Sequence, residues 1–219
     1  MIVKKGKLIS GVIDEATIGE SDGTLLRAIF TSYGPDVCAN VLTNVFRLGI
    51  LVLLEEGFTT SLSDSDLTKE IKEKIDNVLI DSKKVVDSLI QRFNNKQLEA
   101  FPGKTLKETL EIEILRELNG VRNRVGTIIK ESASITNPTV IMAKSGAKGN
   151  ILNLAQMSAC IGQQALRGSR IKDGYIKRTL SCFKRKDLSP RARGFIESNF
   201  KSGLDPVEFF FGAMTGRDS

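Results

Sequence analysis

The sequence predicts a mainly helical fold with a small β element, an α+β class. Two segments, 66–93 and 105–131, repeat apolar residues at helical spacing and are joined by a short loop. One short apolar segment near the start, 7–13, is typical of a strand. Together these observations predict a long antiparallel helical hairpin, accompanied by short helices and an irregular basic segment.

Composition sets limits on the class of protein. The 219 residues are 41% hydrophobic and 26% charged, as in ordinary globular proteins, and they suffice for one larger or two smaller domains. The net charge of +6 is compatible with a polyanionic partner, although many basic proteins bind no nucleic acid. Cys38, Cys160 and Cys182 are odd in number and far apart, which favours reduced core thiols in an intracellular protein. We expect no signal peptide, and the apolar run 48–54 is too short to cross a bilayer.

The absence of histidine narrows the chemistry further. It excludes Ser–His and Cys–His nucleophilic arrangements and any zinc site that contains histidine. Three scattered cysteines cannot form a four-cysteine zinc site, and no pair of carboxylates lies in a glycine-flanked loop. We therefore expect that this chain does not carry out a reaction alone.

The first third contains a strand at 7–13, a short helix or strand at 24–31, and then a strong helix. Pro35 suits the first position of that helix and Gly57 suits its end. Its second half is apolar nearly all round, which predicts a central core helix.

The hairpin that follows has recognisable ends. Ser65 is placed to cap the first helix, Asn94 and Asn95 break it, and Thr105 with Glu108 forms a capping box for the second helix. The apolar stripe of the first helix has one polar interruption, at Ser82. The two stripes consist of Leu67, Ile71, Ile75, Val78, Val85, Leu89 and Phe93, and of Leu106, Leu110, Ile114, Leu118, Val121, Val125 and Ile128.

A glycine-rich stretch comes after the hairpin. An apolar approach at 139–142 leads to a turn at 145–149 that carries Lys148, a run with helical spacing at 150–161, and a polar turn at 162–164. The start of a helix offers free N–H groups and partial positive charge to anions. The stretch therefore predicts a polar wall that small anions can contact.

Amide side chains would form this wall. The spacing puts Asn153, Gln156 and Gln163 near one face, and directs three apolar residues inward: Ile151, Leu152 and Ala155. The alternative is that the amides are buried and satisfy backbone turns. Lys148 could instead be an ordinary solvated lysine in a loop. The turn that carries it is not a phosphate-binding P-loop, because it lacks the required spacing of glycine and hydroxyl residues.

The segment 167–193 holds ten Lys and Arg residues against two acidic residues, a surplus larger than the net charge of the whole chain. It could follow a phosphodiester backbone; the alternatives are a solvated basic face or a docking surface for an acidic subunit. Ser189 and Pro190 start a short helix, and Asp205 with Pro206 starts the last one. One face of that last helix cannot bury three consecutive phenylalanines.

Several motifs carry a family resemblance over nearly the whole chain: KKGKLISGVIDEATIG, GPDVCANVLTNVFRL, SGAKGNILNLAQMSACIGQQ, RGFIESNFKSGL and PVEFFFGAM. Together they resemble the funnel region of the largest subunit of multisubunit RNA polymerases, in the archaeal and eukaryotic form. The resemblance implies a β element at 1–33, a helical funnel domain at 34–135, a pore-lining and cleft segment at 136–203, and a truncated start of the bridge helix at 204–219.

The resemblance implies a role in transcription as part of a DNA-directed RNA polymerase, a nucleotidyltransferase. The region would line the secondary channel, through which nucleoside triphosphates enter and backtracked RNA and cleavage factors pass, and would support the bridge helix beside the active centre. Implied partners are the other polymerase subunits, especially the second-largest, together with DNA, RNA and transcript-cleavage factors, but no membrane. The chain would bind no cofactor, Mg²⁺ being held elsewhere in the assembly, and would be inactive alone. It would be cytoplasmic and nucleoid-associated if archaeal, and nuclear if eukaryotic.

The resemblance also assigns residues. Lys148 would lie near the incoming triphosphate, and the other pore-lining residues would be Arg122, Asn153, Gln156, Gln163, Gln164, Gly168 and Arg170. The bridge-helix residues would be Pro206, Glu208, Phe209, Phe210, Phe211, Gly212, Met214 and Arg217. From the residues alone, Arg122 could equally be a surface charge on its helix.

The chain departs from the family pattern at two histidines. The family's RTLPHF is RTLSCF here, with Cys182, and its FFHAMGGRE is FFGAMTGRD, with Gly212. Glycine inside a helix costs about 1 kcal/mol relative to alanine, so we expect a more flexible bridge-helix start. Two other functions remain open: a stand-alone basic helical module that binds nucleic acid or a regulatory protein, and an independent nucleotide-binding enzyme.

Overall fold

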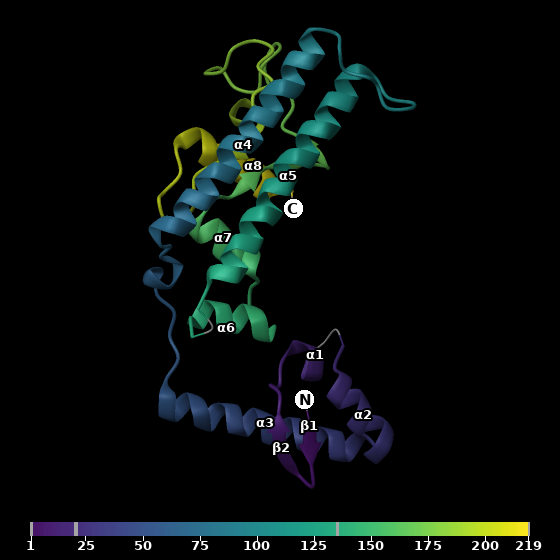
Figure 1. The fold of residues 1–219 in the computed structure, drawn as a ribbon, viewed down its shortest axis with the longest axis vertical. Helices are drawn as coiled ribbons and strands as arrows, with labels where there is room; N and C mark the ends of the chain where they lie inside the picture. Colours follow the sequence, from purple (N-terminus) through teal and green to yellow (C-terminus); the bar gives the residue numbers. More distant parts are fainter. Residues whose placement is uncertain (1, 20–21, 135, 219) are drawn as a thin grey trace. The chain divides into compact units, whose positions relative to one another are not determined.

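The computed structural model describes residues 2–19, 22–134 and 136–218, and the chain divides into two compact units. The first unit consists of residues 1–64 and 134–151, and the second of residues 65–133 and 152–219 (Figure 1). The fold is mainly helical with short antiparallel strands, as the sequence predicts.

The first unit begins with an antiparallel hairpin of β1 (Ile2–Lys4) and β2 (Lys7–Ser10). Lys5 and Gly6, between the strands, both have positive φ, as a two-residue hairpin turn with the twist of its strands requires. Two helices follow, α1 (Glu15–Ile18) and α2 (Thr24–Tyr33). The strand predicted at 7–13 is confirmed, although it is shorter than expected. The segment 24–31, predicted as either a helix or a strand, is a helix.

Helix α3 (Pro35–Glu56) has Pro35 at its start and Gly57 at its end, as predicted. The prediction of a core helix is wrong, because Cys38 is the only residue of α3 that is buried. Its large apolar side chains are exposed: Val37, Leu42, Phe46, Leu48, Ile50, Leu51, Val52, Leu53 and Leu54. By length and composition, α3 is also the one helix among the described residues that could span a membrane, which the run 48–54 did not indicate. Core helices and signal sequences meet the same criterion, so this is weak evidence.

The first unit also contains helix α6 (Pro138–Ser145) and all but the last residue of the 3₁₀ turn η1 (Leu62–Ser65). The sequence analysis missed α6, expecting only an apolar approach at 139–142. Its signal was the dipeptide Asn137-Pro138, since asparagine is a favoured N-cap and proline a favoured first residue. The Asn137 side chain accepts hydrogen bonds from the N–H groups of Thr139 and Val140, and donates to the Asp64 carbonyl at 2.6 Å.

The second unit is built on α4 (Lys69–Asn94) and α5 (Leu106–Ser132), which pack as the predicted antiparallel hairpin (Figure 1). The capping box of Thr105 and Glu108 is confirmed. The N-cap of α4 is Thr68, whose hydroxyl accepts from the Ile71 N–H, whereas Ser65 lies in η1. The predicted cap was thus wrong by three residues, because the intervening residues form a separate turn.

The core of the hairpin runs along one face of α5. Its buried residues are Thr109, Leu110, Ile114, Leu118, Val121, Val125 and Ile129. Helix α4 contributes Ile75, Ser82 and Val86, whereas Val85, which the stripe prediction included, is exposed. The buried Ser82 hydroxyl accepts a 2.6 Å hydrogen bond from Arg124 of α5. The polar interruption in the stripe therefore has a partner on the opposite helix.

Short elements complete the second unit. They are α7 (Ile151–Ser158), β3 (Gly162–Gln163), β4 (Ala165–Leu166), β5 (Ser169–Arg170), the 3₁₀ turn η2 (Arg191–Arg193) and β6 (Phe195–Ile196). β3 pairs with β6, and β4 pairs with β5. The predicted helix at 150–161 exists but is shorter. The predicted polar turn at 162–164 is partly strand, because β6 supplies a pairing partner more than thirty residues away.

Helix α8 (Pro206–Asp218) begins as predicted. The Asp205 carboxylate accepts from the Glu208 N–H at 2.8 Å, and the Glu208 carboxylate accepts from the Asp205 N–H at 3.1 Å. Phe211 is buried and stacks on Phe183 with ring centroids 6.2 Å apart. Phe209 and Phe210 are exposed, which confirms that one face of the helix cannot bury all three rings.

Candidate functional site

A hollow of about 330 Å³ lies against α8 in the second unit. Gln156 of α7 and Gln164, just after β3, line it together with Gly212 and Ala213 of α8. The backbone holds this arrangement: the Gln156 carbonyl accepts a hydrogen bond from the Phe200 N–H at 3.1 Å, which fastens the segment before α8 to α7. Two of the predicted amides thus share a hollow with the predicted bridge-helix residue Gly212.

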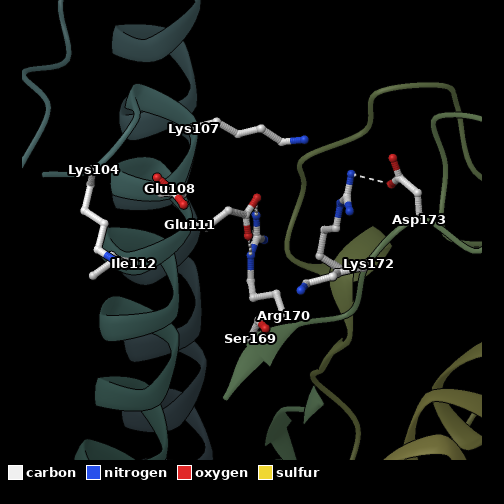
Figure 2. A pocket seen from close by; sticks show the side chains of 10 residues that line it. Lys104, Lys107, Glu108, Glu111, Ile112, Ser169, Arg170, Lys172 and Asp173 are labelled. Atoms are coloured by element: carbon white, nitrogen blue, oxygen red, sulfur yellow. Dashed lines mark hydrogen bonds and ion pairs between the residues drawn. The ribbon is translucent and has the colours of Figure 1, made fainter. Parts of the chain in front are cut away.

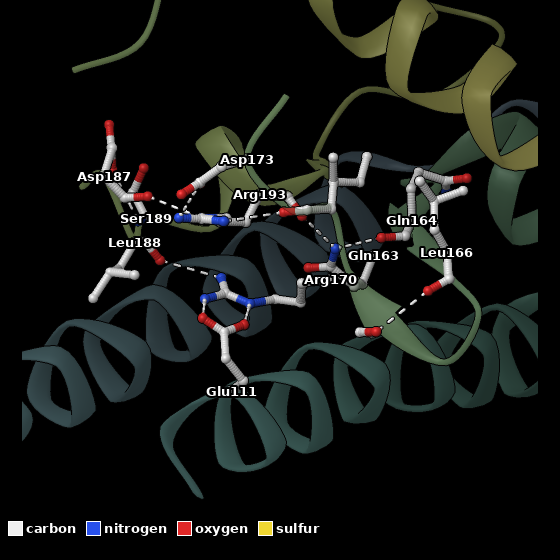
Figure 3. A network of polar contacts seen from close by, with 12 residues as sticks. Glu111, Gln163, Gln164, Leu166, Arg170, Asp173, Asp187, Leu188, Ser189 and Arg193 are labelled. Carbon is white, nitrogen blue, oxygen red and sulfur yellow. Dashed lines mark hydrogen bonds and ion pairs between the residues drawn. The ribbon is translucent and has the colours of Figure 1, made fainter. Parts of the chain in front are cut away.

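Gln163 has a different environment from the one predicted. It lies in β3 rather than on the face of α7, and its side chain is 8% exposed. Its amide nitrogen donates to the carbonyl of Gln164 at 2.6 Å and to that of Arg193 at 2.8 Å (Figure 3). The alternative of a buried amide that satisfies the backbone therefore describes Gln163 well. Its Oε1 atom has no hydrogen-bond partner within the part of the chain that the structure describes.

The apolar side of α7 also differs from the prediction. The buried residues of this helix are Leu154, Ala155 and Ser158, whereas Ile151 and Leu152 are half-buried. Asn153 is exposed. The predicted inward face is therefore right for Ala155, but it is centred on Leu154 and Ser158 rather than on Ile151 and Leu152.

Arg170 is completely buried and paired. Its Nε and Nη2 atoms donate to the two carboxylate oxygens of Glu111 on α5, at 2.9 and 3.1 Å, and its Nη1 donates to the Leu188 carbonyl at 3.1 Å (Figure 3). A bidentate pair of this kind is a strong interaction, and removing Glu111 would leave the buried charge of Arg170 uncompensated. Arg170 therefore fastens β5 to the hairpin.

Arg193 is held in a similar way. It forms an ion pair with Asp173 at 2.8 Å and donates to the carbonyls of Asp187 and Ile171 (Figure 3). Two of the ten cations of the basic segment are thus internal. The exposed cations that remain available to a polyanion include Lys172, Lys177, Lys184, Arg185 and Lys186.

The remaining predicted residues lie in three places. Lys148 is exposed in the first unit, just after Gly146 ends α6 with a positive φ. The Arg122 side chain packs against Gly162, where an added Cβ would lie 3.7 Å from the Arg122 Cβ, and its Nε has no partner among the described residues. Gly168 has a positive φ in the two-residue turn between β4 and β5, a conformation that favours glycine.

The cysteines divide into two kinds. Cys38 and Cys160 are buried, as predicted, whereas Cys182 is exposed. Burial away from water, with a smaller contribution from Glu197, raises the pKa of the Cys160 thiol to about 11. Cys160 is therefore a neutral, unreactive thiol at pH 7. Within the described residues, no three His, Cys, Asp or Glu side chains form a group that could hold a metal ion.

Sequence reasoning missed several residues that shape the site. Glu111 was not recognised because its partner lies 59 residues away and no local spacing marks it. Ile196 and Phe200, which line the hollow against α8, were within the recognised motif RGFIESNFKSGL but had no assigned role.

Comparison with known proteins agrees with this architecture. Residues 1–65 match the family described as RNA polymerase Rpb1, domain 3, and residues 90–196 match RNA polymerase Rpb1, domain 4. Relatives named DNA-directed RNA polymerase subunit Rpo1N are similar over essentially the whole chain. The identity is 43% over 219 residues in Methanothermobacter thermautotrophicus, 44% over 216 residues in Thermococcus celer and 41% over 218 residues in Halococcus morrhuae.

The chain covers only part of these relatives. It spans 25% of the Methanothermobacter thermautotrophicus subunit, 24% of the Thermococcus celer subunit and 62% of the Halococcus morrhuae subunit. Two adjacent domains of one subunit are matched in order, and the similarity to several archaeal subunits extends across both. The chain therefore belongs to the family of archaeal-type RNA polymerase largest subunits.

Proposed function

We propose that this region works within a DNA-directed RNA polymerase, where it lines the secondary channel and supports the start of the bridge helix. The observation that carries the proposal is the hollow that Gln156 and Gln164 line together with Gly212 and Ala213 of α8. Family membership supplies the context, since the relatives are named as subunits of this enzyme.

In this proposal the amides and the cations have separate tasks. Gln156 and Gln164 offer neutral hydrogen-bonding groups beside α8, which restrain that helix without attracting ions strongly. Lys148 adds an exposed positive charge that raises the local concentration of triphosphate, because clefts lined by one sign of charge focus the electrostatic field. The ion pair of Arg170 and Glu111 holds β5 against α5.

The start of α8 is held at several points. Asp205 and Glu208 cap it, and Phe211 stacks on Phe183. Phe209 and Phe210 are left exposed, as expected if further polymerase segments cover them. Gly212 lowers the helix propensity in this first part, so the bridge helix of this protein would bend more easily here than one with histidine.

The assembly would supply what the chain lacks. Other polymerase subunits, above all the second-largest, would be its partners, and Mg²⁺ would be held by another part of the enzyme. DNA, RNA, nucleoside triphosphates and cleavage factors would meet this region only in the assembled enzyme, in the cytoplasm of an archaeal cell. The isolated chain would show no nucleotide turnover.

The proposal predicts that Lys148→Ala raises the KM for nucleotides in an assembled polymerase that carries this sequence. We expect an increase of about two- to fivefold, because an exposed charge contact contributes about 0.5 to 1 kcal/mol. Steady-state transcription assays at varied nucleotide concentration measure the effect. The matched control is Lys144→Ala, which removes an exposed lysine from α6.

Two results would contradict the proposal. An unchanged KM in Lys148→Ala, or an equal effect in Lys144→Ala, would remove Lys148 from the substrate path. Failure of the chain to co-purify with the second-largest subunit would favour a stand-alone basic module instead, and nucleotide turnover by the isolated chain would favour an independent enzyme.

A further inference from the structure

A larger hollow, of about 620 Å³, lies in the second unit, apart from the one against α8. It is bordered by the first two turns of α5 on one side and by residues 169–173 on the other (Figure 2). Ile112, which is 41% exposed, contributes an apolar side chain to its wall. The sequence analysis assigned no role to α5 here.

Every acidic group of this hollow already has a partner. Glu111 pairs with Arg170, and Asp173 pairs with Arg193. Glu108 belongs to the capping box, and hydrogen bonds from the backbone and side chain of Thr105 lower the pKa of its carboxyl group. All three carboxylates are therefore already engaged by groups within the chain.

The lysines of the hollow are not neutralised in this way. Lys104, Lys107 and Lys172 line it, and none of them forms an ion pair within the described part of the chain. Lys104 makes only a minor contribution to the lowered pKa of Glu108. In Figure 2 the side chains of Lys107 and Lys172 extend into the space between α5 and the opposing segment. The residues that line the hollow therefore carry more positive than negative charges, and Ile112 adds an apolar surface.

The available groups suit carboxylates better than phosphates. Arginine forks and free N–H groups at a helix start bind phosphate with several directed hydrogen bonds, whereas a lysine binds it as a point charge. Here both arginines are occupied by carboxylates, and the start of α5 is occupied by its own capping box. Lysine ammonium groups beside an apolar side chain remain, and these complement an acidic peptide that also presents apolar residues.

We propose that this hollow is a docking site for an acidic segment of a partner protein, in which carboxylate side chains contact Lys104, Lys107 and Lys172 and an apolar side chain packs on Ile112. The assignment rests on charge complementarity and shape, and it does not depend on the role of Lys148 or of the hollow against α8. Lys172 belongs to the basic segment 167–193. The proposal thus gives that segment one of the roles that the sequence analysis left open, a docking surface for an acidic protein.

Fluorescence anisotropy tests the proposal with the full 219-residue chain. The probe is a fluorescein-labelled peptide that alternates glutamate with leucine and phenylalanine, and its control has glutamine in place of every glutamate. Lys107→Glu and Lys172→Glu should each weaken binding by about five- to tenfold, because each reversal exchanges an attraction for a repulsion. Ile112→Ala should weaken it by about twofold to fivefold through lost apolar contact.

The matched control is Lys74→Glu, an exposed lysine near the start of α4, which lies beside the end of α5 that is remote from 104–112. It makes the same change in net charge and should alter binding by less than about twofold. Far-UV circular dichroism checks that each variant is folded. Equal losses in Lys74→Glu and Lys107→Glu would overturn the proposal in favour of unspecific charge attraction. So would a single-stranded DNA oligonucleotide that binds more tightly than the peptide and depends on the same lysines, since it would identify a nucleic-acid site.

Discussion

Helices α3 and α5 are both long, but they use their apolar residues in opposite ways. α3 has 22 residues and buries only Cys38, whereas α5 has 27 residues and buries seven. α3 is the more apolar of the two and is apolar nearly all round, so one packed neighbour cannot cover it. α5 concentrates its buried residues on one stripe, from Thr109 to Ile129, and α4, β3 and β5 pack against that helix. Burial therefore follows from the match of a stripe to a partner, and not from apolar content.

The ends of the helices repeat this contrast. α5 and α8 both begin with reciprocal side-chain caps, Thr105 with Glu108 and Asp205 with Glu208. The N-cap of α3 is Gly34, which has no side chain to accept a capping hydrogen bond. The helix also lacks a buried stripe that would compensate for the missing cap. Within this chain, the stability of α3 depends on its own helix propensity and on α2, whereas α5 is stabilised by both packing and capping.

The largest expected effect tests the packing difference. Leu118→Ala in α5 should lower the free energy of unfolding of the second unit by about 2 to 5 kcal/mol, because Leu118 is 1% exposed and its removal leaves a cavity. Leu51→Ala in α3, where the side chain is 59% exposed, should change stability by less than about 0.5 kcal/mol. Urea unfolding followed by circular dichroism measures both. A large loss in Leu51→Ala would show that α3 is packed in the isolated chain after all.

A smaller effect tests capping through pH. Hydrogen bonds from the Glu208 and Thr105 N–H groups lower the pKa values of Asp205 and Glu108 in the folded state. Their stabilising contribution is complete above the ordinary pKa values of about 3.9 and 4.3, and it is lost as the pH falls below them. The protection of α8 amides from hydrogen exchange, reported as a free energy of opening, should therefore decrease between pH 5 and about pH 3.

Asp205→Asn sharpens the same test. Asparagine still caps the helix but does not titrate, so the decrease in α8 protection at acidic pH should become smaller. Helix α3, whose N-cap is a glycine, provides the internal comparison, because no carboxylate of its own caps it. An acid response in α3 as large as that in α8 would exclude the caps as its cause.

The smallest effect concerns one glycine inside each of α8 and α3. Gly212→Ala in α8 should stabilise the helix by about 0.5 to 1 kcal/mol, because an added methyl group would meet only Ile196, at an ordinary 3.9 Å. Gly49→Ala in α3 should give a similar gain, since nothing lies within 4 Å of the added atom. Segment-resolved hydrogen exchange measures both. A loss of stability in Gly212→Ala would mean that α8 is more closely surrounded than the structure shows.

Local features of the fold were predicted well. Pro35, Gly57, the capping box at Thr105 and the start of α8 at Pro206 all depend on residues within four positions of one another. The errors concern positions where distant segments decide. The strand at Gln163 needs β6, and the exposure of α3 reflects the absence of a covering partner among the described residues.

The candidate site shows the same limit. Gln156 and Gln164 could be named from the sequence, and the structure brings them to one hollow with Gly212. The buried pairs of Arg170 with Glu111 and of Arg193 with Asp173 could not be foreseen, because sequence reasoning counted these arginines as part of an exposed basic surface. Charge along the chain does not show which cations will be internal.

The sequence by itself determined the helical hairpin, the helix ends and the family, because periodicity, caps and motifs are local properties. Only the tertiary structure decided which polar groups are buried and which charges remain free. A buried arginine requires a carboxylate that folding brings from elsewhere, so pairing in space selects Arg170 and Arg193 as internal and leaves Lys104, Lys107 and Lys172 at an open hollow.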